Sequence, residues 1–364
     1  MEPPSSAKDR YFMRNALNLS LRGVGNTYPN PSVGAVIVKN NQIISRGWTQ
    51  PGGTPHAEVN ALKGRKYLGA TLYTTLEPCA HFGKTAPCVD KIIESKIKRV
   101  VIGLKDPNPI VNGKGIKKLK KKKIKITIGV LKNEIKRINL GFFNKIKKNK
   151  PFIASKIAIS RNGKMINKRN KWITSKDSRE HGNFLRAKFD AIITGINTVL
   201  KDDPLLNCRH FGMQKLSPIR FILDSGLKLK ENSKIAKTAK NNKTFVLTNT
   251  NNKEKISKLK KSGLIIKILD ENVEKINLEK AVLLISKMGF NNLLLESGPR
   301  LNSAFIKLNL INKIYYFQSK NNVDLKLLSV EKDLNLNNFK NLSFKLSLLK
   351  NIGNDSLRIF EKNV

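Results

Sequence analysis

The sequence predicts an α/β protein built of two domains. Short apolar runs alternate with segments of helical spacing in both halves of the chain, a pattern typical of a sheet with helices on both faces. A chain of 364 residues is also about twice as long as an ordinary domain. Around residues 145–151 the pattern gives way to charge, and Pro151 restarts it. We therefore expect one domain over residues 1–148 and a second over 151–364.

The first half is expected to form the sheet and helices of the first domain. Asn40 and Asn41 separate two apolar runs and predict a hairpin turn. Thr54 and Pro55 suit the N-cap and the first position of a helix. The expected strands are 33–39, 43–48, 70–76, 99–104 and 123–129, and the expected helices are 54–65, 88–97 and 131–146.

The second half repeats the alternation. The expected strands are 152–160, 190–195, 219–224, 244–249, 264–269 and 292–297, and the expected helices are 175–189, 279–289 and the stretch after Gly298. The segment after Tyr316 is rich in Asn, Leu and Lys and predicts no particular element.

Composition excludes several classes of protein. The first residues lack the basic and apolar regions of a secretory signal. No apolar run reaches the ~18 residues of a membrane helix. Three cysteines are too few for a disulfide framework, and thiols in a reducing compartment serve as ligands or core residues. We expect a cytoplasmic protein with no membrane partner.

One histidine and two cysteines lie in a pattern that indicates a catalytic metal site. His56 is followed along the chain by Cys79 and Cys88, and a proline precedes each cysteine. An imidazole and two thiolates give three protein ligands, which leaves a tetrahedral Zn²⁺ one open position. A catalytic site needs that position to activate water, whereas a structural site lacks it.

Glu58 is the expected proton carrier of this site. It lies two residues after His56 on the first turn of the expected helix, and side chains two residues apart do not project together, so Glu58 is a poor co-ligand. A carboxylate beside the activated water can accept its proton and deliver it to a departing amine. The H-x-E…P-C pattern is typical of zinc nucleobase deaminases.

Two other interpretations of these residues stay open. In a structural zinc site, His81 is the nearby candidate for a fourth ligand. The net charge of +44 suggests a basic RNA-binding protein or an RNA-editing deaminase. The lysines are spread along the chain, from 117–126 to 251–261, and aromatic residues do not interleave with them. We therefore do not expect nucleic acid as a partner. Cys208 has no ligand spacing and is expected to be a buried small hydrophobe.

The chain resembles the bifunctional riboflavin-biosynthesis deaminase–reductase family. In the first domain the resemblance rests on a spacing of eight residues between the two cysteines and on four motifs. These are YPNPSVGAVIV (28–38), HAEVNAL (56–62), TLEPCAHFGKTAPC (75–88) and DPNPIVNGKG (106–115). In the second domain it rests on KWITS (171–175), the segment 185–209, FILDS (221–225) and LLLESGPRLN (293–302).

The resemblance implies two reactions on one phosphoribosylamino-pyrimidine: a zinc-dependent hydrolytic deamination, and a reduction of the ribosyl group to ribityl by NADPH. It implies a cytidine-deaminase-like α/β/α domain followed by a dihydrofolate-reductase-like α/β domain. We also expect a homo-oligomer. His56, Cys79 and Cys88 match zinc ligands, Glu58 matches the proton carrier, and Asn30 matches a residue of the pyrimidine pocket.

For the second domain the resemblance implies two groups of residues. Positions that contact the nicotinamide cofactor match Ala158, Trp172, Thr198, Asp202, Ser225, Gly298, Pro299, Arg300, Leu301, Asn302, Ser303 and Ala304. Positions that contact substrate match Asn170, Arg186, Leu206, Arg209 and Glu296. The two arginines are expected to grip a phosphate bidentately.

The second domain also departs from the family pattern. Asn162 stands where an Asp is usual, Asn170 where a Ser is common, and Asn207 where a Thr is common. Near the C-terminus, NKIYYFQSK (312–320) replaces the usual run. A deaminase with a weakened or inactive reductase is therefore the alternative interpretation.

Overall fold

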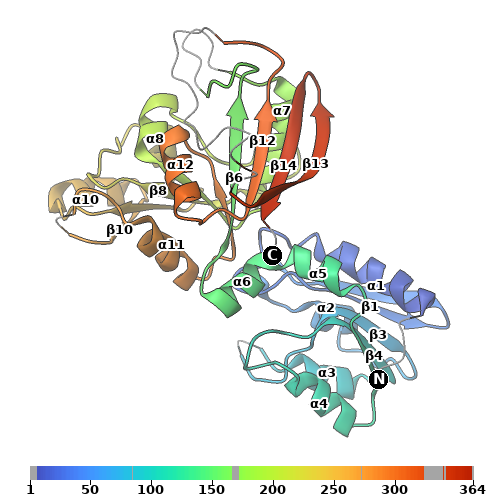
Figure 1. The fold of residues 1–364 in the computed structure, drawn as a ribbon. Helices are drawn as coiled ribbons and strands as arrows, with labels where there is room; N and C mark the ends of the chain where they lie inside the picture. Colours follow the sequence, from blue (N-terminus) through green and yellow to red (C-terminus); the bar gives the residue numbers. More distant parts are fainter. Residues whose placement is uncertain are drawn as a thin grey trace. The chain divides into compact units, whose positions relative to one another are not determined.

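The computed structural model forms two compact units, Met1–Lys150 and Pro151–Val364 (Figure 1). The residues that it describes are 6–83, 85–165, 172–271, 273–323, 339 and 342–362. Each unit holds one sheet with helices packed beside it. The α/β prediction is therefore confirmed.

The sheet of the first unit has the strand order β2-β1-β3-β4-β5. Its strands are β1 (Gly34–Lys39), β2 (Gln42–Trp48), β3 (Thr71–Leu76), β4 (Arg99–Leu104) and β5 (Lys125–Ile128). β1 pairs antiparallel with β2 and β3, whereas β3, β4 and β5 run parallel. The hairpin turns at Asn40 and Asn41, both with positive φ, as predicted. The parallel order brings the carboxyl ends of β3 and β4 side by side.

Helices cover both faces of this sheet, and two glycines show why they pack so closely. A Cβ on Gly34 would lie 1.9 Å from the carbonyl of Ala16 in α1 (Ala7–Ser20). A Cβ on Gly47 would lie 2.3 Å from the carbonyl of Ala57 in α2 (Ala57–Leu62). Gly47 pairs with Ala35, the neighbour of Gly34, and neighbours on a strand point to opposite faces. The other helices are α3 (Cys88–Glu94), α4 (Lys114–Lys121), α5 (Lys132–Ile138) and α6 (Leu140–Lys148).

Two helix predictions in this unit were wrong in detail. α2 begins at Ala57, and its N-cap is His56 in extended backbone rather than Thr54. The single helix expected at 131–146 is two helices that meet at Asn139. The buried Asn139 amide donates to the carbonyl of Ser32 and accepts from its N–H at 3.0 and 2.8 Å. A side chain that bonds backbone in this way competes with helical hydrogen bonding.

The sheet of the second unit has the order β10-β9-β8-β7-β11-β6-β12-β14-β13 among the described residues. Its strands are β6 (Phe152–Ile159), β7 (Ala191–Gly195), β8 (Ile219–Leu223), β9 (Thr244–Thr248), β10 (Ile265–Ile268), β11 (Asn292–Leu295), β12 (Lys313–Gln318), β13 (Phe344–Ile352) and β14 (Asp355–Lys362). The pairs from β10 to β12 are parallel, and β12, β14 and β13 pair antiparallel. β13 and β14 lie in the segment after Tyr316 for which the sequence predicted no element, and β12, which begins before it, was not predicted either.

The helices of the second unit follow the expected positions, with additional short ones. They are α7 (Lys176–Arg186), α8 (Ile196–Asp202), α9 (Lys234–Lys237), α10 (Lys253–Lys261), α11 (Leu278–Lys287) and α12 (Pro299–Lys307). Within the described ranges, no helix is both long and apolar enough to cross a membrane.

Candidate functional sites

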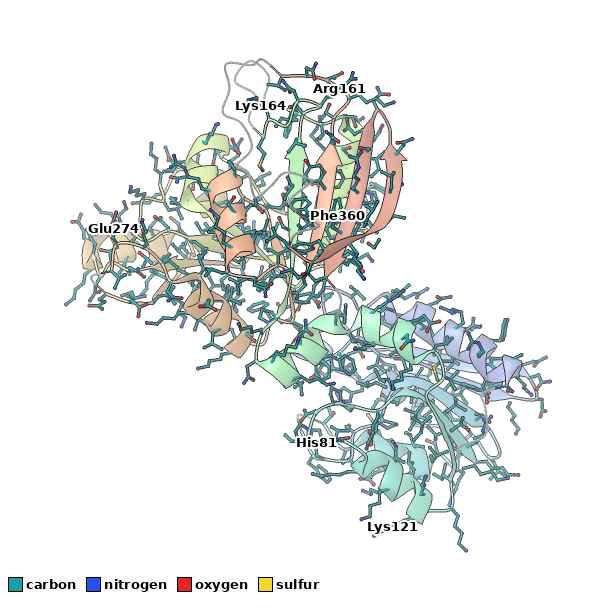
Figure 2. The ribbon with its side chains drawn as sticks, in the orientation of Figure 1. His81, Lys121, Arg161, Lys164, Glu274 and Phe360 are labelled. Atoms are coloured by element: carbon teal, nitrogen blue, oxygen red, sulfur yellow. The ribbon has the colours of Figure 1, made fainter. Side chains whose placement is uncertain are left out.

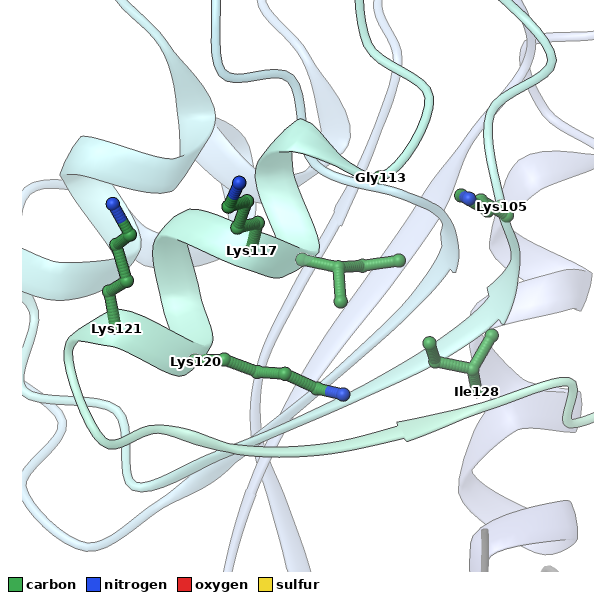
Figure 3. A pocket seen from close by; sticks show the side chains of 7 residues that line it. Lys105, Gly113, Lys117, Lys120, Lys121 and Ile128 are labelled. Carbon is green, nitrogen blue, oxygen red and sulfur yellow. The ribbon is translucent and has the colours of Figure 1, made fainter. Parts of the chain in front are cut away.

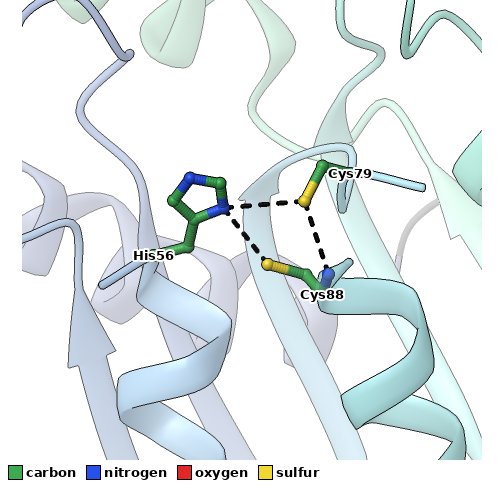
Figure 4. A group of neighbouring side chains, drawn as sticks. All are labelled: His56, Cys79 and Cys88. Carbon is green, nitrogen blue, oxygen red and sulfur yellow. Dashed lines mark hydrogen bonds between the residues drawn. The ribbon is translucent and has the colours of Figure 1, made fainter. Parts of the chain in front are cut away.

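Three side chains from separate segments converge in the first unit (Figure 4). His56 precedes α2 and Cys79 follows β3, whereas Cys88 begins α3, as predicted. The Nδ1 atom of His56 lies 3.2 Å from the sulfur of Cys88 and 3.6 Å from that of Cys79. All three ligand atoms lie within 4.8 Å of one another. One imidazole nitrogen and two sulfurs at this spacing fit a tetrahedral Zn²⁺ that keeps a fourth position open.

The two sulfurs have different environments. The thiol and backbone N–H of Cys88 both bond the sulfur of Cys79, and together with His56 they lower the pKa of Cys79 to about 4 despite burial. The same negative sulfur and burial raise the pKa of Cys88. A divalent cation favours the thiolate form of its cysteine ligands. The donor set therefore suits a soft metal such as zinc.

Glu58 lies beside this group on the first turn of α2 and is 4% exposed. Burial raises the pKa of its carboxyl, and the His56 imidazole opposes that rise. The hydroxyl of Thr74 on β3 donates to Glu58 Oε1 at 3.3 Å. A buried carboxyl with a raised pKa can take up and release a proton near neutral pH.

Glu77 is a buried residue of the cysteine motif to which the sequence analysis assigned no role. Its carboxylate accepts the backbone N–H groups of Asp106, Gly113 and Ile116 at 3.3, 3.0 and 3.3 Å. Glu77 follows β3 and precedes Cys79 by two residues, so it fastens the 106–116 segment beside the metal group. The available signal was an acidic residue directly after an apolar strand, next to a candidate ligand.

Asn30 and His81 lie in loops of the same unit. The Asn30 amide donates to the carbonyl of Gly53 at 2.9 Å, three residues before His56. His81, labelled in Figure 2, lies between β3 and α3. Its buried Nδ1 has no hydrogen-bond partner among the described residues. The metal group found there does not include His81, so the geometry gives no support to a four-ligand structural site.

In the second unit, two of the predicted substrate residues form an ion pair. Nε and Nη2 of Arg186, at the end of α7, donate to the two carboxylate oxygens of Glu296 at 2.7 and 2.9 Å. Glu296 directly follows β11. Burial alone would raise the pKa of Glu296, but Arg186 holds it below its ordinary value. The fork of Arg186 thus faces a carboxylate, which differs from the expected phosphate grip.

Lys156 on β6 adds a second cation that the sequence analysis did not include. Burial lowers the pKa of its ammonium, and the nearby Glu296 opposes the effect while Arg186 adds to it. β6 lies next to β11 in the sheet, which explains how residues so distant in the sequence meet. Lys156 is half-buried, and a group whose pKa is shifted by burial and by a charged neighbour is a candidate for a functional site.

Several predicted cofactor residues meet where α12 begins. The N–H of Gly298, the N-cap of α12, donates to the hydroxyl of Thr198 in α8 at 3.2 Å. The side chain of Asn302 is fully buried and bonds Ser155 and Ser297. Pro299 is the first residue of α12. The members of the same helix that stay partly accessible are Arg300, Leu301 and Ala304, whereas Ser303 is buried.

The remaining predicted residues are spread over the second unit. Ala158 lies on β6, Asp202 ends α8, and Ser225 follows β8. Trp172 is half exposed, with the Arg179 guanidinium 4.7 Å from its ring centroid. Leu206 is buried with a φ of 49°, and Nη1 of Arg209 donates to the Asn207 side chain. Cys208 is buried, as expected. Asn170 lies outside the described residues.

A pocket of about 430 Å³ lies beside α4 in the first unit (Figure 3). Its lining is Lys105, Gly113, Ile116, Lys117, Lys120, Lys121 and Ile128. None of the predicted site residues lines it. The pocket and the metal group are therefore separate features of the first unit.

Both units match known protein-family models. Residues 6–104 match the cytidine and deoxycytidylate deaminase zinc-binding region, and residues 151–319 match the RibD C-terminal domain. The chain is 38% identical to the riboflavin biosynthesis protein RibD of Aquifex aeolicus, over 97% of this chain and 98% of that protein.

Two solved structures resemble this chain over nearly its whole length. The RibD of Acinetobacter baumannii is 32% identical with a TM-score of 0.85, over 98% of this chain and 99% of that one. A deaminase/reductase of Thermotoga maritima is 32% identical with a TM-score of 0.82, over the same shares of the two chains. The two units thus have the expected deaminase and reductase folds, in the expected order.

Proposed function

The chain belongs to the RibD family of riboflavin biosynthesis proteins, and we propose how its residues divide the work of this bifunctional deaminase and reductase. Zinc is the metal of the first unit, and NADPH is the reductant of the second. The observation that carries the proposal is the convergence of His56, Cys79 and Cys88 beside a buried Glu58.

The substrate proposed for this chain follows from a relative. The Thermotoga maritima protein is described as a diaminohydroxyphosphoribosylaminopyrimidine deaminase and 5-amino-6-(5-phosphoribosylamino)uracil reductase. For this chain we expect hydrolysis of the amino group of 2,5-diamino-6-(5-phosphoribosylamino)pyrimidin-4(3H)-one, with release of ammonia. Reduction of the ribosyl group to ribityl then follows.

In the deamination, zinc supplies a Lewis acid that makes water acidic near neutral pH. His56, Cys79 and Cys88 would hold the metal. Glu58 accepts a proton from the attacking water and delivers it to the amine that leaves the ring. Its raised pKa suits both transfers, and the Thr74 hydroxyl keeps the carboxylate in place. Asn30 would line the pyrimidine pocket.

In the reduction, NADPH supplies the hydride. The N-terminal end of α12 with Thr198 would hold the cofactor, since backbone N–H groups at a helix start favour phosphate. Arg186 and Lys156 keep Glu296 ionised between them, so that it can accept hydrogen bonds from substrate hydroxyls. Of the two arginines expected to bind phosphate, Arg186 is paired with Glu296, whereas the guanidinium of Arg209 pairs with no carboxylate among the described residues. Arg209 is therefore the proposed phosphate ligand.

The test supplies the diamino-pyrimidinone phosphate together with NADPH and follows ammonia and NADPH separately. Both should change, ammonia first. Removal of metal by a chelator should stop ammonia release, whereas NADPH oxidation with the deaminated intermediate should continue. Ammonia release by metal-free protein would contradict the assignment of the first unit.

The alternative of a weakened reductase receives no structural support from Asn162. Its Oδ1 accepts the Val323 N–H at 3.1 Å, and its Nδ2 donates to the Val323 carbonyl at 2.6 Å. A carboxylate cannot donate the second bond, so the amide is used where it stands. Normal ammonia release without NADPH oxidation in the same experiment would favour the alternative.

We also propose that the chain forms a homo-oligomer. Among the described residues, β13 is an edge strand of nine residues whose Leu346, Leu348 and Leu349 are exposed. An exposed edge of this length offers unpaired backbone groups to another strand, and two identical edges can pair antiparallel about a two-fold axis. Light scattering on a size-exclusion column should give a mass of at least two chains, and Leu348→Lys should lower it.

A further inference from the structure

Arg220 is a completely buried arginine at the second position of β8. Each of its five N–H groups has an acceptor. Nε donates to the Thr244 hydroxyl at 2.8 Å, and Nη2 donates to the carbonyls of Ile235 and Asn242 at 3.2 and 2.9 Å. Nη1 donates to the Thr238 hydroxyl at 2.9 Å and to the carbonyl of Leu205 at 2.8 Å.

No carboxylate pairs with Arg220 among the described residues. Burial lowers the pKa of its guanidinium to about 10, and no counter-charge opposes the shift. A buried cation without a partner is costly unless every donor is bonded. The guanidinium is thus held by neutral groups alone, and four of these belong to the α9 and β9 region while one belongs to the segment after α8.

That segment, residues 203–209, carries two of the proposed substrate residues, Leu206 and Arg209. Its backbone is fastened from several sides. Leu205 bonds Arg220 from within the protein, whereas the Asn207 carbonyl accepts Nη1 of Arg186 from the ion-paired site at 3.0 Å. Between these bonds, Leu206 has a positive φ, a backbone conformation that non-glycine residues adopt only when their surroundings impose it.

We propose that Arg220 is a positioning residue of the reductase, which sets the backbone of residues 203–209 so that Leu206 and Arg209 meet the substrate. This inference rests on the proposed function of those two residues. Arg220 touches neither substrate nor cofactor and acts through the carbonyl of Leu205. The bond fixes the residue before Leu206, whereas Arg186 fixes the residue after it.

The first test is Arg220→Lys in the full-length protein. Lysine keeps the charge but has three donors on one nitrogen and cannot reach all five acceptors. The KM of the reductase for the deaminated pyrimidine should rise roughly tenfold or more, since a displaced segment weakens the charge-assisted contact of Arg209 with the substrate. The KM for NADPH and the release of ammonia should stay at wild-type values. Wild-type KM for the pyrimidine in folded protein would overturn the proposal.

Thr244→Val is the matched control. It removes the acceptor of Nε within the same buried network but leaves the bond to Leu205 in place. Both variants should lower the melting temperature, and only Arg220→Lys should raise the KM for the pyrimidine. If Thr244→Val raises that KM equally, Arg220 has a merely structural role and the proposal is wrong.

Arg209→Ala separates this inference from the proposed function. A raised pyrimidine KM in Arg209→Ala together with a wild-type value in Arg220→Lys refutes the positioning role alone. A wild-type KM in Arg209→Ala refutes the proposed substrate site itself. If Arg220→Lys does not fold, Arg220→Gln takes its place, because this shorter and neutral side chain lacks both Nη atoms, and so the bond to Leu205, without leaving a charge buried; a raised pyrimidine KM supports the proposal and a wild-type KM overturns it.

Discussion

The metal group of the first unit and the ion-paired group of the second differ in how far apart their residues lie in the sequence. His56 and Cys88 are 32 residues apart in the sequence, whereas Arg186 and Glu296 are 110 apart. The first group contains side chains with few uses other than metal binding and proton transfer. The second contains common surface residue types, which acquire a special environment only because the fold brings the end of α7 to the neighbouring strands β6 and β11. A site made of unusual residue types can be recognised in a sequence. A site made of common residues that become special only through their contacts cannot.

Glu58→Gln should give the largest effect. Loss of the proton carrier should lower ammonia release by roughly 10²- to 10⁴-fold, while bound zinc, measured by elemental analysis, stays at the wild-type level. NADPH oxidation with the deaminated intermediate should not change. Asp90→Asn is the matched control, because Asp90 follows the ligand Cys88 by two residues but pairs with Lys118 on the surface. Ammonia release that survives in Glu58→Gln would show that another group carries the proton.

Glu296→Gln should have the next largest effect, in the other unit. It leaves the charge of Arg186 buried without its partner, which costs about 3 kcal/mol of unfolding free energy, and reductase kcat/KM should fall. Ammonia release should be untouched. Glu361→Gln breaks the more exposed pair with Lys313 in the same unit and should change neither quantity. If Glu296→Gln and Glu361→Gln lose equal amounts of stability and of reductase kcat/KM, burial does not make the Arg186–Glu296 pair more important than an exposed pair.

Asp9→Asn should give the smallest effect and concerns an ion pair that supports the fold. Burial alone would raise the pKa of Asp9, but Arg99 and Tyr73 donate to it and hold its pKa below the ordinary 3.8. The stabilisation is therefore present above pH ~4 and is lost as the pH falls through the lowered pKa. At pH 7 the variant should lose about 2 kcal/mol, and the difference should shrink below pH 4.

Hydrogen exchange of peptides from β3 and β4 measures the difference in unfolding free energy between the variant and the wild type, once at pH 7 and once below pH 4. Glu134→Gln removes the exposed pair with Arg14 and should leave exchange unchanged. If the stability difference between Asp9→Asn and the wild type does not change with pH, the Asp9 carboxylate is not the group whose titration controls it.

The sequence predicted the metal site nearly completely. His56, Cys79, Cys88 and Glu58 are rare or strongly polar residues in a short span, and the expected strands and helices placed them at the ends of elements. The N-cap of α2 was misplaced because Thr54 and Pro55 suit a helix start equally well. The break at Asn139 could not be seen, since its cause is a bond to Ser32, 107 residues earlier.

The second site was less accessible to sequence reasoning. Arg186 and Glu296 were named only through the family resemblance, and nothing near them in the sequence indicated that they pair. Lys156 and Arg220 were missed because one lysine or arginine in an apolar strand has no partner that the local pattern identifies. β13 and β14 were missed as well, because the Asn and Lys content of the tail hides the alternation of an edge hairpin.

Because Glu77 fastens residues 106–116 at particular points, the segment should tolerate insertions and larger side chains at some positions and not at others. Its three backbone bonds fix both ends of residues 106–116, and a Cβ on Gly115 would lie 2.1 Å from the carbonyl of Pro78. Ile110, near the middle, is more than half exposed. Extra residues at Ile110 can therefore bulge into solvent, whereas a single added methyl group at Gly115 pushes directly on the residue that precedes Cys79.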